Sequence, residues 1–163
     1  MVMDIEVGKM LIRDLRESDL KEVKHIRDAS LDYLDTQLSY SYEETCNWFR
    51  TEKPQWYGIE IRDKLAGYIR TSNHDHVNKT LYVGLDLHPN FRGHGYAFQA
   101  YQSFLNWLKV NGYLTAHLKV QITNHKAYNL YRKLGFAPVG VIPNAIILPS
   151  GKTIDSVLMY KSL

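Results

Sequence analysis

Residues 85–97 have the types and spacing of an anion-binding turn. A strand-like stretch ends at Pro89, Gly93 and Gly95 follow two residues apart, and an amphipathic helical pattern begins at Tyr96. Two glycines let the backbone turn tightly and come close to a ligand. The helix that follows offers unpaired N–H groups and the positive end of its dipole, which attract phosphate. The segment therefore predicts a phosphate site, although loops also use glycine pairs for turning alone.

Residues 124–136 form a second segment, with an unusual face at helical spacing. Asn124 is a good N-cap after the strand-like stretch 118–122, and Gly135 fits the position after the last helical turn. Asn124, Ala127 and Tyr131 lie along one face of about two turns. That face is polar at both ends, whereas a core-facing stripe is usually apolar throughout. Taken alone, Tyr131 is explained better as an amphipathic residue half-buried at the edge of the core.

Together the two segments resemble the GNAT superfamily of acyl-CoA-dependent N-acyltransferases. The stretch 92–97, Arg-Gly-His-Gly-Tyr-Ala, matches the signature Arg/Gln-x-x-Gly-x-Gly/Ala. The stretch 124–136 matches the signature Asn-x-x-Ala-x-x-x-Tyr-x-Lys-x-Gly-Phe residue for residue. The specific match covers roughly 81–136. The resemblance implies an acetyl-CoA-dependent N-acetyltransferase that acts on an amine and needs no metal.

By this resemblance, acetyl-CoA contacts the backbone of one strand and the glycine turn. The strand backbone pairs with the pantetheine arm, the amides of the turn hold the pyrophosphate, and basic side chains add charge. Lys133 is explained equally well as a solvated helix residue. The residues that the resemblance implies for cofactor binding are Leu85, Leu87, Arg92, Gly93, His94, Gly95, Tyr96, Ala97, Asn124 and Lys133.

Direct attack of an amine on a thioester makes three chemical demands. The amine must lose a proton, because a free alkylammonium has a pKa near ~10.4. The thioester oxygen gains negative charge and requires an N–H donor, for which we expect the backbone of Leu87. The leaving thiolate takes a proton, and the resemblance implies Tyr131 as the general acid.

The resemblance does not identify the base. Some family members that acetylate protein N-termini carry a glutamate five residues before the motif asparagine, and this chain has Lys119 there. Asp86 is the first candidate, because a carboxylate inside an apolar strand is unfavourable without a partner or a role. A hydrogen bond to a neighbouring loop explains Asp86 equally well. Glu60 and His88 are the further candidates.

The acceptor site is expected at the segment 31–40, which is rich in tyrosine and contains Asp32 and Asp35. Aromatic walls with carboxylates suit a cationic amine, but ordinary loop polarity is a sufficient explanation. The stretch 151–159 resembles the Gly-x-x-x-Asp-x-x-x-Met tail of ribosomal-protein-alanine, spermidine and sugar-nucleotide amine acetyltransferases. Three functions stay open: acetylation of a small primary amine, acetylation of a protein N-terminus or lysine, and a non-catalytic acyl-CoA-binding module.

The hydrophobic pattern predicts the elements that position these residues. Together with the resemblance it predicts an α+β GNAT fold: a mixed, mostly antiparallel sheet of six to seven strands, helices on both faces, and a V-shaped splay between the fourth and fifth strands. The polar stretch 72–79 is expected to be a turn. The expected strands are 9–13, 56–62, 65–71, 80–87, 114–122, 137–148 and 153–161, and the expected helices are 19–28, 42–50, 96–110 and the one that starts at 124.

Composition limits the remaining function classes. The 163 residues fit one domain over 1–163, and the net charge of +3 is too small and too scattered to indicate nucleic acid binding. No apolar run approaches the ~20 residues of a membrane span. The single Cys46 excludes an internal disulfide and is expected to be buried, which fits a cytoplasmic protein. The stretch 74–76, His-Asp-His, has no third metal ligand spaced nearby, and a homodimer is expected by family analogy alone.

Overall fold

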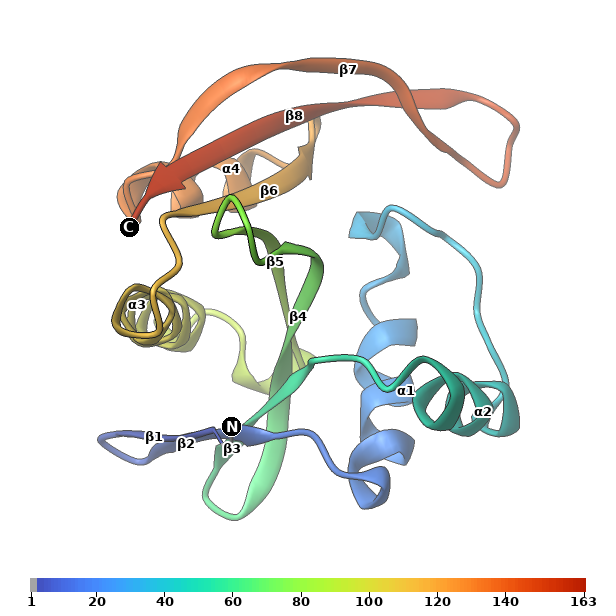
Figure 1. Ribbon diagram of the computed structural model, residues 1–163. Helices are drawn as coiled ribbons and strands as arrows, with labels where there is room; N and C mark the ends of the chain where they lie inside the picture. Colours follow the sequence, from blue (N-terminus) through green and yellow to red (C-terminus); the bar gives the residue numbers. More distant parts are fainter. Residues whose placement is uncertain (1–2) are drawn as a thin grey trace.

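The computed structural model describes residues 3–163 and contains one eight-stranded sheet (Figure 1). The strand order is β1-β2-β3-β4-β5-β6-β8-β7. Every neighbouring pair is antiparallel except β5 and β6, which run parallel. The strands are β1 (Asp4–Val7), β2 (Met10–Asp14), β3 (Tyr57–Ile61), β4 (Lys64–Asp75), β5 (Thr80–Leu87), β6 (Thr115–Gln121), β7 (Ala137–Ile147) and β8 (Thr153–Ser162).

Helices cover both faces of the sheet. Figure 1 shows α1 and α2 on one side and α3 on the other, with α4 beside β6 and β8. Ser41 and Glu44 form the capping box that starts α2, as the sequence predicts. Among the described residues, no helix combines the length and the apolar character needed to cross a bilayer. The helices are α1 (Leu20–Asp28), α2 (Tyr42–Glu52), α3 (Tyr96–Val110) and α4 (His125–Lys133).

The α+β architecture predicted from the sequence is confirmed, with two differences in the sheet. The sheet has eight strands rather than six to seven, because Asp4–Val7 forms a hairpin with β2 around Gly8. The polar stretch 72–79 is not a turn throughout. β4 continues to Asp75, which pairs with Thr80, and only the residues between them turn.

The predicted splay is confirmed between β5 and β6. The two strands pair only over Thr80–Tyr82 and Thr115–His117, although β5 runs on to Leu87 and β6 to Gln121. Beyond the paired residues the two strands are no longer hydrogen-bonded neighbours. The sheet is therefore divided into a part of five strands and a part of three that separate in a V.

The register between β4 and β5 determines which backbone groups face this V. The His88 N–H donates to the Ala66 carbonyl, and Leu87 lies opposite Gly67. Because antiparallel pairs alternate between bonded and non-bonded, the N–H and C=O groups of Leu85 and Leu87 point away from β4. They therefore lie on the edge of β5 that faces β6.

Two apolar clusters lie on the two faces of the sheet, and alternate side chains of β5 pack into the larger one. The larger cluster joins Leu81, Val83 and Leu87 to Tyr101 and Phe104 of α3. The smaller cluster packs α1 and α2 around the other face. Its buried residues are Leu15, Leu20, Val23, Ile26, Cys46 and Tyr68.

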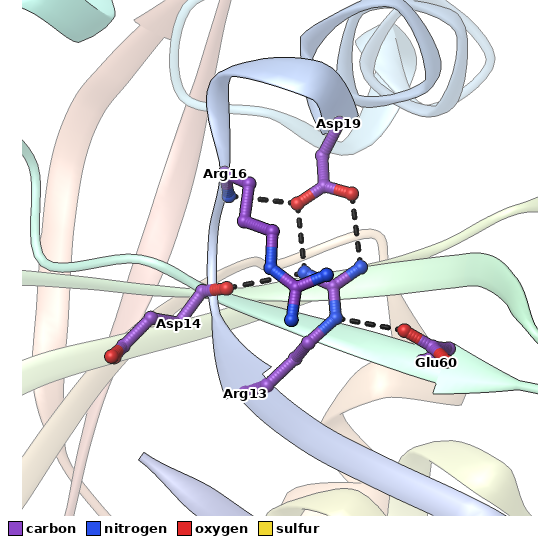
Figure 2. A network of polar contacts seen from close by, with 5 residues as sticks. All are labelled: Arg13, Asp14, Arg16, Asp19 and Glu60. Carbon is purple, nitrogen blue, oxygen red and sulfur yellow. Dashed lines mark hydrogen bonds and ion pairs between the residues drawn. The ribbon is translucent and has the colours of Figure 1, made fainter. Parts of the chain in front are cut away.

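A buried ion-pair network anchors the start of α1 to the sheet (Figure 2). Arg13 of β2 donates to both carboxylate oxygens of Asp19, at 2.8 and 3.0 Å, and to Glu60, at 2.8 Å. Burial acts to raise the pKa of Asp19, but the Arg13 hydrogen bonds and the Arg16 backbone N–H outweigh it, so this pKa lies below its ordinary value. The pKa of Arg13 is raised by the same pairing.

Candidate functional site

A cavity of about 700 Å³ occupies the V between β5 and β6. Its walls come from β4, β5, β6, the glycine turn, α3, α4 and the loop after α1. Of the predicted cofactor-binding residues together with Asp86 and Tyr131, only His94 does not line it. The predicted residues that do are Leu85, Asp86, Leu87, Arg92, Gly93, Gly95, Tyr96, Ala97, Asn124, Tyr131 and Lys133.

The glycine turn has the backbone conformation that the sequence predicts. Gly93 has φ 78° and Gly95 has φ 81°, both in the left-handed region that favours glycine. Gly95 is the N-cap of α3 and has no side chain to occupy the helix end. The first intrahelical bond runs from the Gln99 N–H to the Gly95 carbonyl. The N–H groups of the first turn, from Tyr96 onward, are therefore directed out of the helix end, at the wall of the cavity.

The guanidinium of Arg92 contacts protein groups at the end of β5. It donates from Nε to the Leu87 carbonyl, at 3.0 Å, and from Nη2 to Ser30 Oγ, also at 3.0 Å. These bonds join the glycine turn to the end of α1. His94 has an exposed side chain, so only its backbone belongs to the turn.

Tyr131 projects into the cavity from α4. Asn124 Oδ1 accepts from the Ala127 N–H at 3.2 Å, which confirms Asn124 as the N-cap of this helix. The Tyr131 ring meets the ring of Tyr101 edge-on, with centroids 5.7 Å apart. Burial raises the pKa of Tyr131 above its ordinary value, so the phenol holds its proton at neutral pH.

Asp86 lies on the opposite face of β5 from Leu85 and Leu87, and it forms an ion pair with Arg70 of β4. Arg70 Nε is 2.8 Å from Asp86 Oδ2, and Arg70 Nη2 is 3.5 Å from Oδ1. The guanidinium lies across Gly84, where an added Cβ would come within 2.7 Å of Nη2. Glycine at this position therefore gives Arg70 the room to reach Asp86. Asp86 is buried, while a third of the Arg70 side chain stays accessible.

The other two candidate bases have partners elsewhere. Glu60 accepts from Arg13 and does not line the cavity (Figure 2). His88 Nδ1 accepts from the Asn90 N–H at 3.0 Å, and its ring stacks on His25. His88 does not line the cavity either.

His74, from the stretch considered for metal binding, has both ring nitrogens within hydrogen-bond distance of hydroxyl groups. Nδ1 is 2.9 Å from the Tyr113 hydroxyl, and Nε2 is 2.9 Å from the Thr71 hydroxyl. Burial lowers the pKa of His74, as does the charge of His76. Hydrogen bonds to neighbouring hydroxyl groups therefore account for the position of His74 in the sheet.

The half of the cavity on the α1 side has aromatic and polar walls. Tyr33 and Asp35 line it from the loop after α1, and Trp56 lines it from the start of β3. Buried Gln121 of β6 donates from Nε2 to the carbonyl oxygen of Asp32 at 2.9 Å. This bond connects the loop to the smaller part of the sheet, across the V.

Sequence reasoning missed several residues of this cavity, among them Arg70, Tyr101, Lys119 and Gln121. Arg70 could have been found from strand alternation, since it shares a face with Tyr68 and Ser72. Tyr101 was assigned to the apolar stripe of α3. No local signal points to Gln121, whose partners lie 87 and 89 residues away.

The sequence of this chain is similar to those of known proteins. The chain matches the model of the acetyltransferase (GNAT) family over residues 20–136. It is 31% identical over 83 residues to a [ribosomal protein bS18]-alanine N-acetyltransferase of Haemophilus ducreyi. That match covers 51% of this chain and only 57% of the relative.

Solved structures extend the likeness to the whole fold. A spermidine N-acetyltransferase from Vibrio cholerae, in complex with CoA and spermine, has a TM-score of 0.89 at 18% identity, covering 96% of both chains. RimL, a ribosomal L7/L12 alpha-N-protein acetyltransferase in complex with coenzyme A, has a TM-score of 0.86 at 20% identity, covering 100% of this chain and 98% of that one. The family model, which matches well over half of the residues, shows that this chain belongs to the GNAT family of acetyltransferases.

Proposed function

We propose that this protein transfers the acetyl group of acetyl-CoA to a primary amine of a small molecule. One observation carries the proposal: a free strand edge, an anion-binding turn and a protonated tyrosine all line the same cavity. Family membership makes acetyl-CoA the donor to expect. The amine would enter from the α1 side, where the polar and aromatic walls lie.

The V between β5 and β6 would hold the cosubstrate. The outward N–H and C=O groups of Leu85 would pair with the pantetheine amides, much as a peptide adds to a sheet edge, and Leu87 would direct its N–H at the thioester end of that arm. The amides from Gly93 to Ala97 would bind the pyrophosphate at the start of α3. Lys133 lines the same wall and would add positive charge.

The chemical step would use three groups. Asp86 would bind the incoming ammonium and take its proton, directly or through a water. The Leu87 N–H would stabilise the negative charge that develops on the thioester oxygen. Tyr131 would protonate the departing thiolate, a role that suits a phenol whose pKa is raised by burial.

A protein N-terminus is the second candidate acceptor. It is favoured by the Haemophilus ducreyi relative, whose name specifies an alanine of a ribosomal protein. Against it, Gln121 fixes the loop after α1 against β6, so that Tyr33 and Asp35 form a wall on the acceptor side. We therefore place small amines first.

Calorimetric titration with acetyl-CoA, followed by thiol-release assays over a panel of amines and peptides, tests the proposal. We expect binding with one site per chain and release that depends on a small amine. Thiol release with peptides alone would indicate that the acceptor is a protein N-terminus instead. Binding without release for any acceptor would indicate an acyl-CoA-binding module instead, and absence of binding would contradict the cosubstrate site.

A further inference from the structure

Two cationic side chains lie over successive positions on one face of β5. Tyr82, Gly84 and Asp86 share this face, because side chains alternate along a strand. The Arg70 guanidinium lies over Gly84, and Lys119 Nζ lies 5.5 Å from the centre of the Tyr82 ring. The two cations come from the strands on either side, β4 and β6, and both line the cavity.

The charges along this face are arranged in order. Lys119 is at the Tyr82 end, Arg70 lies in the middle, and Asp86 lies at the other end. Asp86 is next to the edge residues Leu85 and Leu87 proposed to hold the cosubstrate. Along this face of β5 the charge therefore changes from positive near Tyr82 to negative at Asp86.

The two cations have unused capacity for a ligand. Arg70 uses Nε and Nη2 on Asp86, and its Nη1 has no hydrogen-bond partner among residues 3–163. Within the same residues Lys119 makes no ion pair; its contact is with the face of the Tyr82 ring. A guanidinium beside an ammonium suits a carboxylate or a phosphate, because each provides several charge-assisted hydrogen bonds.

We propose that the acceptor is a primary amine that also carries an anionic group, a carboxylate or a phosphate, which Arg70 and Lys119 bind. The proposal rests on the proposed function and specifies its substrate class. The ammonium end of such a molecule would lie at Asp86, near the thioester, and the anionic end would lie over Gly84 and Tyr82. A polyamine would place a second cation against Arg70 and Lys119, which is unfavourable.

Thiol-release kinetics with four short amines test this assignment. β-Alanine carries a carboxylate, phosphoethanolamine a phosphate, ethanolamine a neutral hydroxyl, and putrescine a second ammonium. We expect kcat/KM to be about tenfold or more higher for at least one anionic amine than for ethanolamine, with putrescine lowest. The comparison between β-alanine and phosphoethanolamine identifies which anion the site prefers.

Variants of the two cations locate the anion site. Lys119→Gln should raise KM for the preferred anionic amine by about three- to tenfold and leave KM for ethanolamine unchanged. Arg70→Gln also removes the ion pair of Asp86, so it should lower kcat/KM for every amine, and more strongly for the anionic one. Lys119 is exposed and unpaired, so its variant tests the site even where loss of the Arg70–Asp86 pair impairs folding. Lys64→Gln, at the exposed start of β4, is the matched control and should change neither value.

Equal or higher kcat/KM for ethanolamine or putrescine would overturn the anionic acceptor while leaving the acetyltransferase proposal intact. The same conclusion follows if Lys119→Gln raises KM equally for anionic and neutral amines. Acetyl-CoA binding without thiol release for any amine would overturn both proposals at once. The pattern across the four amines therefore separates the two failures.

Discussion

Gln121 Nε2 donates a hydrogen bond to the carbonyl oxygen of Asp32, 2.9 Å away, and so joins the loop after α1 to β6. A second, longer bond reaches the carbonyl oxygen of Leu34 at 3.4 Å. The side chain is buried, and its two bonds help to hold the loop that carries Tyr33 and Asp35 at the acceptor side of the cavity. Gln121 is thus a positioning residue in the proposed enzyme.

Gln121→Ala should loosen this loop. We expect KM for the acceptor to rise about tenfold, because the loop loses its two hydrogen bonds to β6, while the Kd of acetyl-CoA stays within about twofold. Steady-state kinetics and calorimetry separate the two effects. Gln102→Ala, on the exposed face of α3, is the control. An equal loss in acceptor and acetyl-CoA binding would show that Gln121 supports the whole fold and not the loop.

Tyr131→Phe should slow turnover. Loss of a general acid typically costs ~10²–10⁴-fold, so kcat should fall within that range while acetyl-CoA still binds. Tyr128→Phe is the matched control, because Tyr128 lies on the same helix and does not line the cavity. Unchanged kcat in Tyr131→Phe would remove this residue from the proposed role.

The pH dependence of kcat should reflect the burial of Tyr131. Its pKa is raised above the ordinary 10.0, so the group is protonated, and active as an acid, at every lower pH. We expect no alkaline loss of kcat from this group below that value. A pH profile of the wild-type protein and of Tyr131→Phe measures it. An alkaline limb near neutral pH that disappears in the variant would contradict the prediction.

Gly95→Ala should weaken acetyl-CoA binding. The added methyl group has open space, but φ of 81° strains any residue with a Cβ by about 1 kcal/mol, and the turn must shift to relieve it. We expect the Kd to rise about tenfold in calorimetry. Gly151→Ala is the control, since Gly151 has φ 84° and equal space but lies in the β7–β8 turn. Gly151→Ala should lower the free energy of unfolding by a comparable amount and leave the Kd of acetyl-CoA unchanged.

Asp19→Asn should destabilise the fold and alter its acid dependence. Removing one partner of a buried ion pair costs about 3–5 kcal/mol, because Arg13 keeps its charge. Since the pKa of Asp19 is lowered on folding, its contribution is complete above the ordinary 3.8 and is lost as pH falls through the lowered folded value. Urea unfolding at neutral and acid pH measures both effects.

Asp63→Asn, exposed in the turn between β3 and β4, is the control for Asp19. It should change the free energy of unfolding by less than about 0.5 kcal/mol. A loss in Asp19→Asn that is no larger than in this control would show that the network of Figure 2 contributes little to stability.

The motifs of the glycine turn and of α4 were predictable from the sequence because their signals are local. Gly93, Gly95 and Asn124 each have the conformation or cap that their residue type favours. The Arg70–Asp86 pair was not predictable in this way. It depends on the register of β4 against β5, which pairs residues 16 positions apart.

The number of strands was underestimated for a related reason. The stretch Asp4–Val7 is only four residues long, so its own hydrophobic pattern is a weak signal. Its pairing with β2 makes it a strand. Glu60 was a candidate base from its sequence position. In the structure it pairs with Arg13, which lies on another strand. The strand at Asp4–Val7 and the ion pair of Glu60 both depend on contacts with other strands, which their own local sequence does not reveal.

The short pairing of β5 with β6 has a thermodynamic consequence. On the proposed function, acetyl-CoA would insert between the two parts of the sheet as a temporary strand, so that part of the tertiary structure is completed by the cosubstrate. A ligand that binds only the folded state stabilises it by mass action, by about 2.7 kcal/mol at a hundredfold excess over Kd. The thermal stability of this chain would then follow the supply of acetyl-CoA, and the amides of Leu85 and Leu87 would exchange with solvent most slowly when that supply is high.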